Sequence, residues 1–158
     1  MITVERAANE TFRSVGMSTV ADDPPPSLED LTAFIVSGIA WVFSGSGGDA
    51  IAYLLAERLD GRIHIEQVSV HPGHAHRGIG AALIETASRR SADLGLDGLS
   101  LTTFANVPWN APYYSSLGFT ELAEANWTAG LRQRVDEERE RGLDEWPRVV
   151  MVRGAVTS

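Results

Sequence analysis

Hydrophobic and polar residues alternate most clearly at positions 62–70, and a helical period follows at 79–87. In the first stretch, one predicted strand face carries Ile63 and Ile65, and the other carries His64, Glu66, Val68 and Val70. In the second, Ile79, Leu83 and Ala87 recur at the spacing of one helix face, with Gly95 as a C-cap. The pattern predicts a strand, a turn and a helix in direct succession.

The rest of the chain predicts further strands and helices separated by turn residues. Strands are expected at 2–6, 39–44, 49–58, 98–104, 119–123 and 148–153, and helices at 6–17, 27–38, from 110, and at 128–141. The Asp60-Gly61 pair predicts a tight hairpin. This order predicts one α+β domain over residues 1–158, with a mixed, mostly antiparallel central sheet flanked by helices.

The junction between strand and helix predicts a site for a phosphate-bearing ligand. Residues 77–81 open the helix with free backbone N–H groups and the positive end of the helix dipole, and glycine leaves room for an anion. The dinucleotide fingerprint fails, because Leu83 stands where it requires Gly or Ala. The Walker pattern fails as well, since Ile79 and Gly80 replace its Lys and Ser/Thr.

The run Ala75-His76-Arg77-Gly78-Ile79-Gly80 follows a strand that ends in Val70-His71-Pro72. This stretch resembles the acyl-CoA loop of the GNAT superfamily of N-acetyltransferases, whose pattern is Gln or Arg, two residues, Gly, one residue, then Gly or Ala. The resemblance implies that acetyl-CoA is bound by Ala75, His76, Arg77, Gly78, Ile79, Gly80 and Ala81. It also implies that the backbone of Val68 and Val70 pairs with the pantetheine amides. Ala75 departs from the pattern, so weaker or rearranged binding is expected.

A second stretch, from Tyr114 to Gly118-Phe119, has a tyrosine, three residues and Gly-Phe. It resembles the later GNAT motif, and two motifs in the correct order are more specific than one. The resemblance implies that Tyr114 is the general acid for the departing CoA thiolate, while Tyr113 has the structural role. Asn110 either caps the short helix or hydrogen-bonds the pantetheine arm.

Glu66 is the candidate general base for the acceptor amine, and its alternative is a solvent-facing or ion-paired strand residue. The resemblance thus implies an acetyl-CoA-dependent N-acetyltransferase that acts directly on a primary amine of a small molecule or peptide. Two alternatives remain open. One is a non-catalytic acyl-CoA-binding sensor or interaction module, which Ala75 favours. The other is transfer to a non-amine acceptor or of a longer acyl chain.

The amino-acid composition limits the reaction mechanisms and the binding partners that we expect. The net charge of −8 argues against nucleic-acid binding, which needs clustered basic residues. There is no cysteine, which removes the best nucleophile for an acyl-enzyme and makes direct transfer the economical mechanism. His71, His74 and His76 lack the partner ligands of a metal site, so no metal is expected.

No apolar run approaches twenty residues, and the first residues are charged where a signal peptide would be apolar. We therefore expect a cytoplasmic protein that does not contact a membrane. The family resemblance also implies that the protein can form a homodimer.

Overall fold

A computed structural model describes residues 39–44, 50–71, 73, 78–107, 110–142 and 147–154. The elements predicted at 2–6, 6–17 and 27–38 lie outside these residues, as do Ala75, His76 and Arg77.

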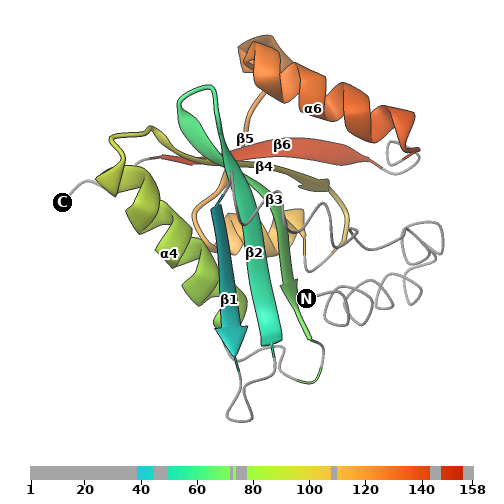
Figure 1. Ribbon diagram of the computed structural model, residues 1–158. Coiled ribbons are helices and arrows are strands. Elements are labelled where there is room, and N and C mark those ends of the chain that lie inside the picture. Colours follow the sequence, from blue (N-terminus) through green and yellow to red (C-terminus); the bar gives the residue numbers. More distant parts are fainter. Residues whose placement is uncertain are drawn as a thin grey trace. The chain divides into compact units, whose positions relative to one another are not determined.

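The six strands of the described part of the chain form one sheet in the order β1-β2-β3-β4-β6-β5 (Figure 1). Their bounds are β1 Ile39–Ser44, β2 Ala50–Leu59, β3 Arg62–Val70, β4 Gly98–Phe104, β5 Thr120–Glu121 and β6 Arg148–Gly154. Strands β3 and β4 pair in parallel, whereas β1 with β2, β4 with β6, and β5 with β6 pair antiparallel. The predicted α+β class with a mixed sheet is confirmed.

Within the residues that the structure describes, three α-helices and a 3-10 turn accompany the strands. They are α4 Ile79–Asp93, α5 Ala111–Ser116, η3 Glu124–Asn126 and α6 Ala129–Glu140, which confirms the helices predicted for these regions. Gly95 ends α4 as predicted, with φ 70° and with the N–H of Leu96 donating to the carbonyl of Ser91. Strand β5 is shorter than predicted, because Phe119 is buried ahead of it and η3 begins soon after it.

The chain divides into two compact units. In one are β1, β2 up to Glu57, β3 from Ile65, and α4 up to Thr86; the other contains 58–64 and everything from Ala87 on. The first unit buries apolar residues of β2, β3 and α4, namely Ala52, Tyr53, Leu54, Leu55, Ala56, Ile65, Ile79, Leu83 and Ile84. The second buries Ile63, Ala87, Leu99, Leu101, Phe104, Val107, Phe119, Leu131, Val150 and Met151. Each unit therefore has an apolar core.

Burial along β3 does not follow the predicted alternation. Ile63, His64 and Ile65 are all buried, so both faces of the strand are covered there. His64 is only 1% exposed, and its Nδ1 lies 2.9 Å from Oγ of Ser100 on β4, the residue opposite it. Because burial disfavours the charged ring, the pKa of His64 falls to about 4.

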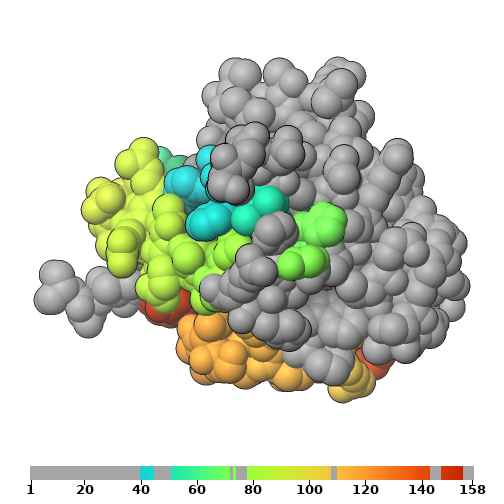
Figure 2. Space-filling model, turned by 90° about the horizontal axis from the view of Figure 1, so that it is seen from below, coloured from blue at the N-terminus to red at the C-terminus, as the bar shows by residue number. Residues whose placement is uncertain are grey.

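Strand β1 carries the large apolar residues that are exposed in the described part of the chain. Val42 is 48% exposed and Phe43 is 41% exposed. Atoms of β1, in cyan, reach the surface in Figure 2. The register of β1 against β2 shifts after Phe43, as a β-bulge does, and such a bulge disturbs an otherwise regular ladder.

The β2–β3 hairpin caps helix α6. Asp60 and Gly61 turn the chain with φ 50° and 83°, the conformation of a type I′ hairpin that the sequence predicted. The Oδ2 atom of Asp60 accepts a hydrogen bond of 2.7 Å from the backbone N–H of Gly130, in the first turn of α6. A Cβ atom on Gly130 would lie 2.5 Å from that oxygen, so a larger residue there would displace the Asp60 side chain.

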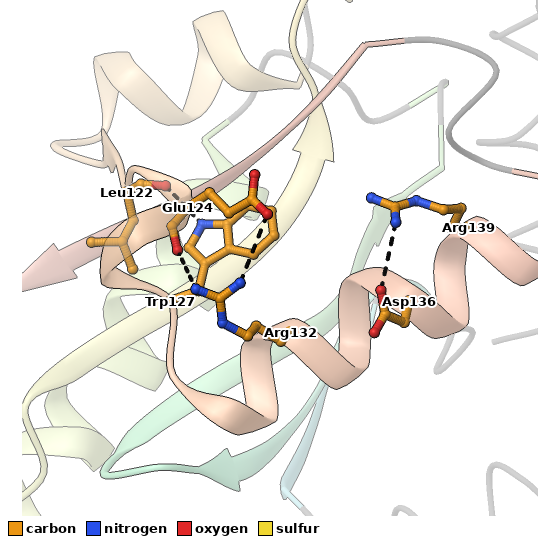
Figure 3. Close-up of polar contacts among 6 residues, drawn as sticks. All are labelled: Leu122, Glu124, Trp127, Arg132, Asp136 and Arg139. Atoms are coloured by element: carbon orange, nitrogen blue, oxygen red, sulfur yellow. Dashed lines mark hydrogen bonds and ion pairs between the residues drawn. The ribbon is translucent and has the colours of Figure 1, made fainter.

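The start of α6 is held by a small aromatic and polar cluster (Figure 3). The indole N–H of Trp127 donates to the carbonyl of Leu122 at 2.9 Å, and the guanidinium of Arg132 lies 5.9 Å from the centre of the indole ring. Arg132 also donates to the carbonyl of Glu124 at 2.8 Å. Trp127 is therefore a structural residue of this helix start.

Further along α6, Glu138 connects the helix to the sheet. It pairs with Arg148 of β6 at 3.2 Å and accepts a hydrogen bond from the hydroxyl of Thr102 on β4. The Arg148 guanidinium also stacks on the ring of Phe104, with 4.4 Å to its centroid. Burial lowers the pKa of Arg148, and the neighbouring carboxylate of Glu138 partly offsets the effect.

Candidate active site

The second half of β3 carries three predicted site residues. Glu66, Val68 and Val70 are all partly exposed, and Oε1 of Glu66 is shielded from solvent. Strand β3 pairs with β4 at Ile63 and His64, and these three residues follow later along β3. Backbone groups of β3 past the ladder can pair with an extended ligand in the manner of an added strand.

The loop after β3 ends in the start of α4, where an anion site was predicted. Gly78 has φ 76°, a conformation that favours glycine, and no atom lies within 4 Å of a Cβ placed there. Its carbonyl accepts the N–H of Ala82 at 3.0 Å, so Ile79 to Ala81 begin the helix. The first turn contains no acidic residue. Its free N–H groups and the helix dipole suit a phosphate.

The second motif folds as helix α5 and the return of the chain toward the core. Gly118, with φ 93°, turns the chain after the helix, and Phe119 is then buried. The rings of Tyr114 and Phe119 meet edge to face, with centroids 5.7 Å apart. The spacing of tyrosine, three residues and Gly-Phe therefore has a local cause, because the glycine brings the phenylalanine back against the tyrosine one helical turn earlier.

The phenol of Tyr114 is held in its protonated form. Burial raises the pKa of Tyr114 to about 12, and the neighbouring phenol of Tyr113, whose ring centroid is 5.6 Å away, adds to the effect. At neutral pH the group can donate a hydrogen bond or a proton. We expected the structural role for Tyr113, but it is Tyr114 that contacts Phe119, so the two roles are not cleanly divided between the tyrosines.

Asn110 lies just before α5, and its side chain makes no capping hydrogen bond to the helix. The capping alternative is therefore wrong for the side chain, although the backbone carbonyl of Asn110 accepts the N–H of Tyr114 at 2.9 Å. The side-chain Oδ1 instead accepts a 2.5 Å hydrogen bond from the hydroxyl of Thr103 on β4. Sequence reasoning missed Thr103, because a threonine in a strand carries no signal of such a contact.

The predicted site residues fall into two sets. Tyr114 and Asn110 belong to the second unit and share one helix and its entry. The first unit contains the described donor-side residues, which are Glu66, Val68, Val70, Gly78, Ile79, Gly80 and Ala81. Ala75, His76 and Arg77 lie outside the described residues.

Over the residues that the structure describes, no three His, Cys, Asp or Glu side chains gather as a metal site would need. His74 and His76 are not among those residues, whereas His71 is. None of the described helices is both long enough and apolar enough to cross a membrane.

Comparison with known proteins gives consistent matches. A sequence model described as the acetyltransferase (GNAT) family matches residues 4–119, well over half of the chain. Nourseothricin acetyltransferase is 22% identical with a TM-score of 0.56, and the match covers 74% of this chain and 65% of that one. N-acetylglutamate synthase from Neisseria gonorrhoeae, solved with coenzyme A and N-acetyl-glutamate, is 14% identical with a TM-score of 0.70. The match covers 98% of this chain and 32% of that one.

A GNAT-family acetyltransferase from Staphylococcus aureus Mu50 matches over nearly its whole length. It is 16% identical with a TM-score of 0.70, and 96% of this chain and 92% of that chain are covered. The chain spans less than two thirds of the first two proteins. At sequence identities this low, the structural similarity establishes the fold alone.

Proposed function

The chain belongs to the acetyltransferase (GNAT) family, and on this premise we propose that it transfers an acetyl group from acetyl-CoA directly to a primary amine of a small molecule or peptide. The observation that carries the proposal is the partly buried ring of Tyr114, which packs edge to face on Phe119 in its family motif and keeps its phenol protonated. A second support is Gly78, whose positive φ precedes the helix start that the acyl-CoA motif calls for. Known members with this fold include proteins named for an antibiotic and for an amino acid product.

Binding of the donor would use the residues around the start of α4. Backbone N–H groups from Gly78 to Ala81 suit the pyrophosphate, with His76 and Arg77 as side-chain partners in the same motif. Ala75 supplies only its backbone. The backbone of Val68 and Val70 would pair with the pantetheine amides, and Asn110 would add a side-chain contact.

Acetyl transfer begins with a neutral amine. Glu66, which lies on β3, would act as the base, and its carboxylate would take a proton from the ammonium directly or through a water. The amine nitrogen then forms a bond to the acetyl carbon while the bond from that carbon to sulfur breaks. The nitrogen also loses its second proton to solvent, so the products are an amide and a CoA thiolate, and the thiolate must be stabilised and finally protonated.

Tyr114 would stabilise the departing sulfur. Its pKa of about 12 keeps the proton on the phenol before the reaction. A free thiol has a reference pKa of about 8.5, so full transfer of the phenol proton to a free thiolate would be uphill by about 5 kcal/mol. The phenol therefore acts mainly by donating a hydrogen bond to sulfur as negative charge develops on the sulfur. A donor of this kind lowers the activation barrier by about 3 kcal/mol.

Steady-state acetyl transfer tests the proposal. Release of the free CoA thiol would be followed with a panel of small amines, amino acids and peptides. We expect turnover with at least one amine, and Tyr114→Phe should lower kcat about 100-fold while leaving the Kd for acetyl-CoA within about threefold. Tyr113→Phe, which removes the neighbouring hydroxyl, is the matched control and should retain most activity. An unchanged kcat in Tyr114→Phe would remove this residue from the mechanism.

Ala75 supports a second candidate, a non-catalytic acyl-CoA-binding sensor or interaction module. The same experiments separate it from the enzyme. A sensor would bind acetyl-CoA yet release no thiol with any acceptor.

We further propose one acetyltransferase domain over residues 1–158 that works in the cytoplasm. Size-exclusion chromatography with light scattering would decide between a monomer and a homodimer.

A further inference from the structure

We propose that Thr103 is a positioning residue that locks the carboxamide of Asn110, so that Asn110 Nδ2 is presented as a hydrogen-bond donor to a carbonyl of the acetyl-CoA pantetheine arm. The inference rests on the proposed function and names a residue that neither sequence motif contains. Thr103 lies on β4 and Asn110 directly before α5, so a strand fixes the entry of the helix that carries Tyr114.

The hydrogen bonds of Asn110 account for all its polar groups except one. Its N–H donates to the carbonyl of Val107 at 2.9 Å, and its carbonyl accepts from the N–H of Tyr114 at 2.9 Å. Its Oδ1 accepts from the Thr103 hydroxyl at 2.5 Å. Over the described part of the chain, no hydrogen bond involves Nδ2, and Asn110 is partly exposed. The NH₂ group of the carboxamide is thus left for a ligand, to which it can only donate.

This orientation selects the kind of ligand group that is recognised. An NH₂ donor pairs with a carbonyl oxygen and repels an ammonium, so it suits the amide carbonyls of pantetheine rather than the acceptor amine. Thr103 is only 4% exposed, which protects its hydrogen bond from competition with water. A rigid donor loses little freedom when the ligand binds, which is how positioning contributes to affinity.

Titration of four variants with acetyl-CoA tests the role of the Thr103 hydroxyl. Thr103→Val keeps the shape of the side chain but loses the hydrogen bond, and it should raise the Kd and KM for acetyl-CoA about fivefold to tenfold with kcat within about twofold. Thr103→Ser keeps the hydroxyl and should behave as the wild type. Asn110→Asp keeps the oxygen that accepts from Thr103 but replaces the donor, and it should bind acetyl-CoA at least as weakly as Asn110→Ala.

A truncated ligand and a double variant separate positioning from general structural damage. Adenosine 3′,5′-bisphosphate, which lacks pantetheine, should bind equally well to every variant. Thr103→Val combined with Asn110→Ala should lose no more acetyl-CoA affinity than Asn110→Ala alone, because Thr103 acts through Asn110. Additive losses, or equal losses for both ligands, would overturn the positioning role.

The proposed function and this inference fail in different ways. If the wild type does not bind acetyl-CoA, the proposed function is wrong and the inference falls with it. If the wild type binds and turns over acetyl-CoA while Thr103→Val binds it unchanged, the inference alone is wrong.

Discussion

Helices α4 and α6 are held in the fold by different forces. Along its 15 residues, α4 buries one continuous side, with Ile79, Leu83, Ile84, Ala87, Ser88 and Ser91 all less than 9% exposed. Along its 12 residues, α6 buries Leu131, while Asp60, Arg148 and Glu124 contact it through polar groups. The family match includes α4 and ends before α6.

The difference matters because the two kinds of attachment respond to different conditions. Apolar burial depends little on pH and is not weakened by ionic screening, whereas hydrogen-bonded and paired charges weaken with screening and protonation. The start of α4 and the motif of Tyr114 carry the proposed chemistry and lie in the matched part. Helix α6 is expected to open locally before the rest of the fold does.

The largest expected effect comes from removing apolar bulk in α4. Ile84→Ala deletes a side chain that is 0% exposed and leaves a cavity, so the free energy of unfolding should fall by about 3.5 kcal/mol. Chemical denaturation would measure it. Arg89→Ala, on the exposed side of the same helix, is the control and should change stability by less than about 0.5 kcal/mol. Equal effects of the two would mean that α4 is not anchored by its apolar side.

The second prediction concerns the titratable side chain buried in β3. The pKa of His64 is about 4 when folded and near 6.5 when unfolded, so the unfolded chain binds the extra proton between these values. Stability from this residue is complete above pH 6.5 and is lost as the pH falls toward 4, by about 3 kcal/mol in all. His64→Gln should remove this part of the pH dependence. If the free energy of unfolding falls by the same amount between pH 7 and pH 5 in the wild type and in His64→Gln, the prediction is wrong.

An intermediate effect is expected where α6 is tied to the sheet. Glu138→Gln leaves the Arg148 guanidinium half-buried without its countercharge, at a cost of about 2 kcal/mol. Hydrogen exchange would show α6 amides exchanging roughly 30-fold faster while α4 amides keep their protection. Protection lost equally in both helices would mean that α6 and α4 open together. The same change in exchange should be produced in the wild type, more weakly, by high salt.

The smallest effect is expected on the exposed side of α6. Asp136 and Arg139 pair at 3.7 Å with side chains 68% and 60% exposed (Figure 3). Asp136→Asn should change the free energy of unfolding by less than about 0.5 kcal/mol, because water and salt already screen this pair. A loss as large as that of Glu138→Gln would show that burial does not distinguish the two ion pairs.

The sequence predicted those parts of the fold and site that depend on neighbours along the chain. The hairpin at Asp60-Gly61 and the end of α4 at Gly95 each follow from a glycine and its neighbours. Boundaries were less exact where a short strand is decided by tertiary context, as at β5.

Contacts between residues distant in the sequence were not predictable. Asp60 and Gly130 are 70 positions apart, and Arg148 and Thr102 are 46 apart. Each uses common polar residues whose partners become known only when the chain folds. The hydrogen bond of Thr103 with Asn110 spans only seven positions, but it crosses from a strand to a helix entry and follows neither helical nor strand spacing.

Calorimetric titration of the wild-type protein with acetyl-CoA, beside CoA and a nicotinamide dinucleotide, tests the central claim most directly. The account predicts saturable one-to-one binding of acetyl-CoA and CoA and none of the dinucleotide, because Gly78 and the start of α4 follow the acyl-CoA pattern rather than the dinucleotide fingerprint. Absence of acetyl-CoA binding would contradict it, and preferential binding of the dinucleotide would assign the loop to another ligand.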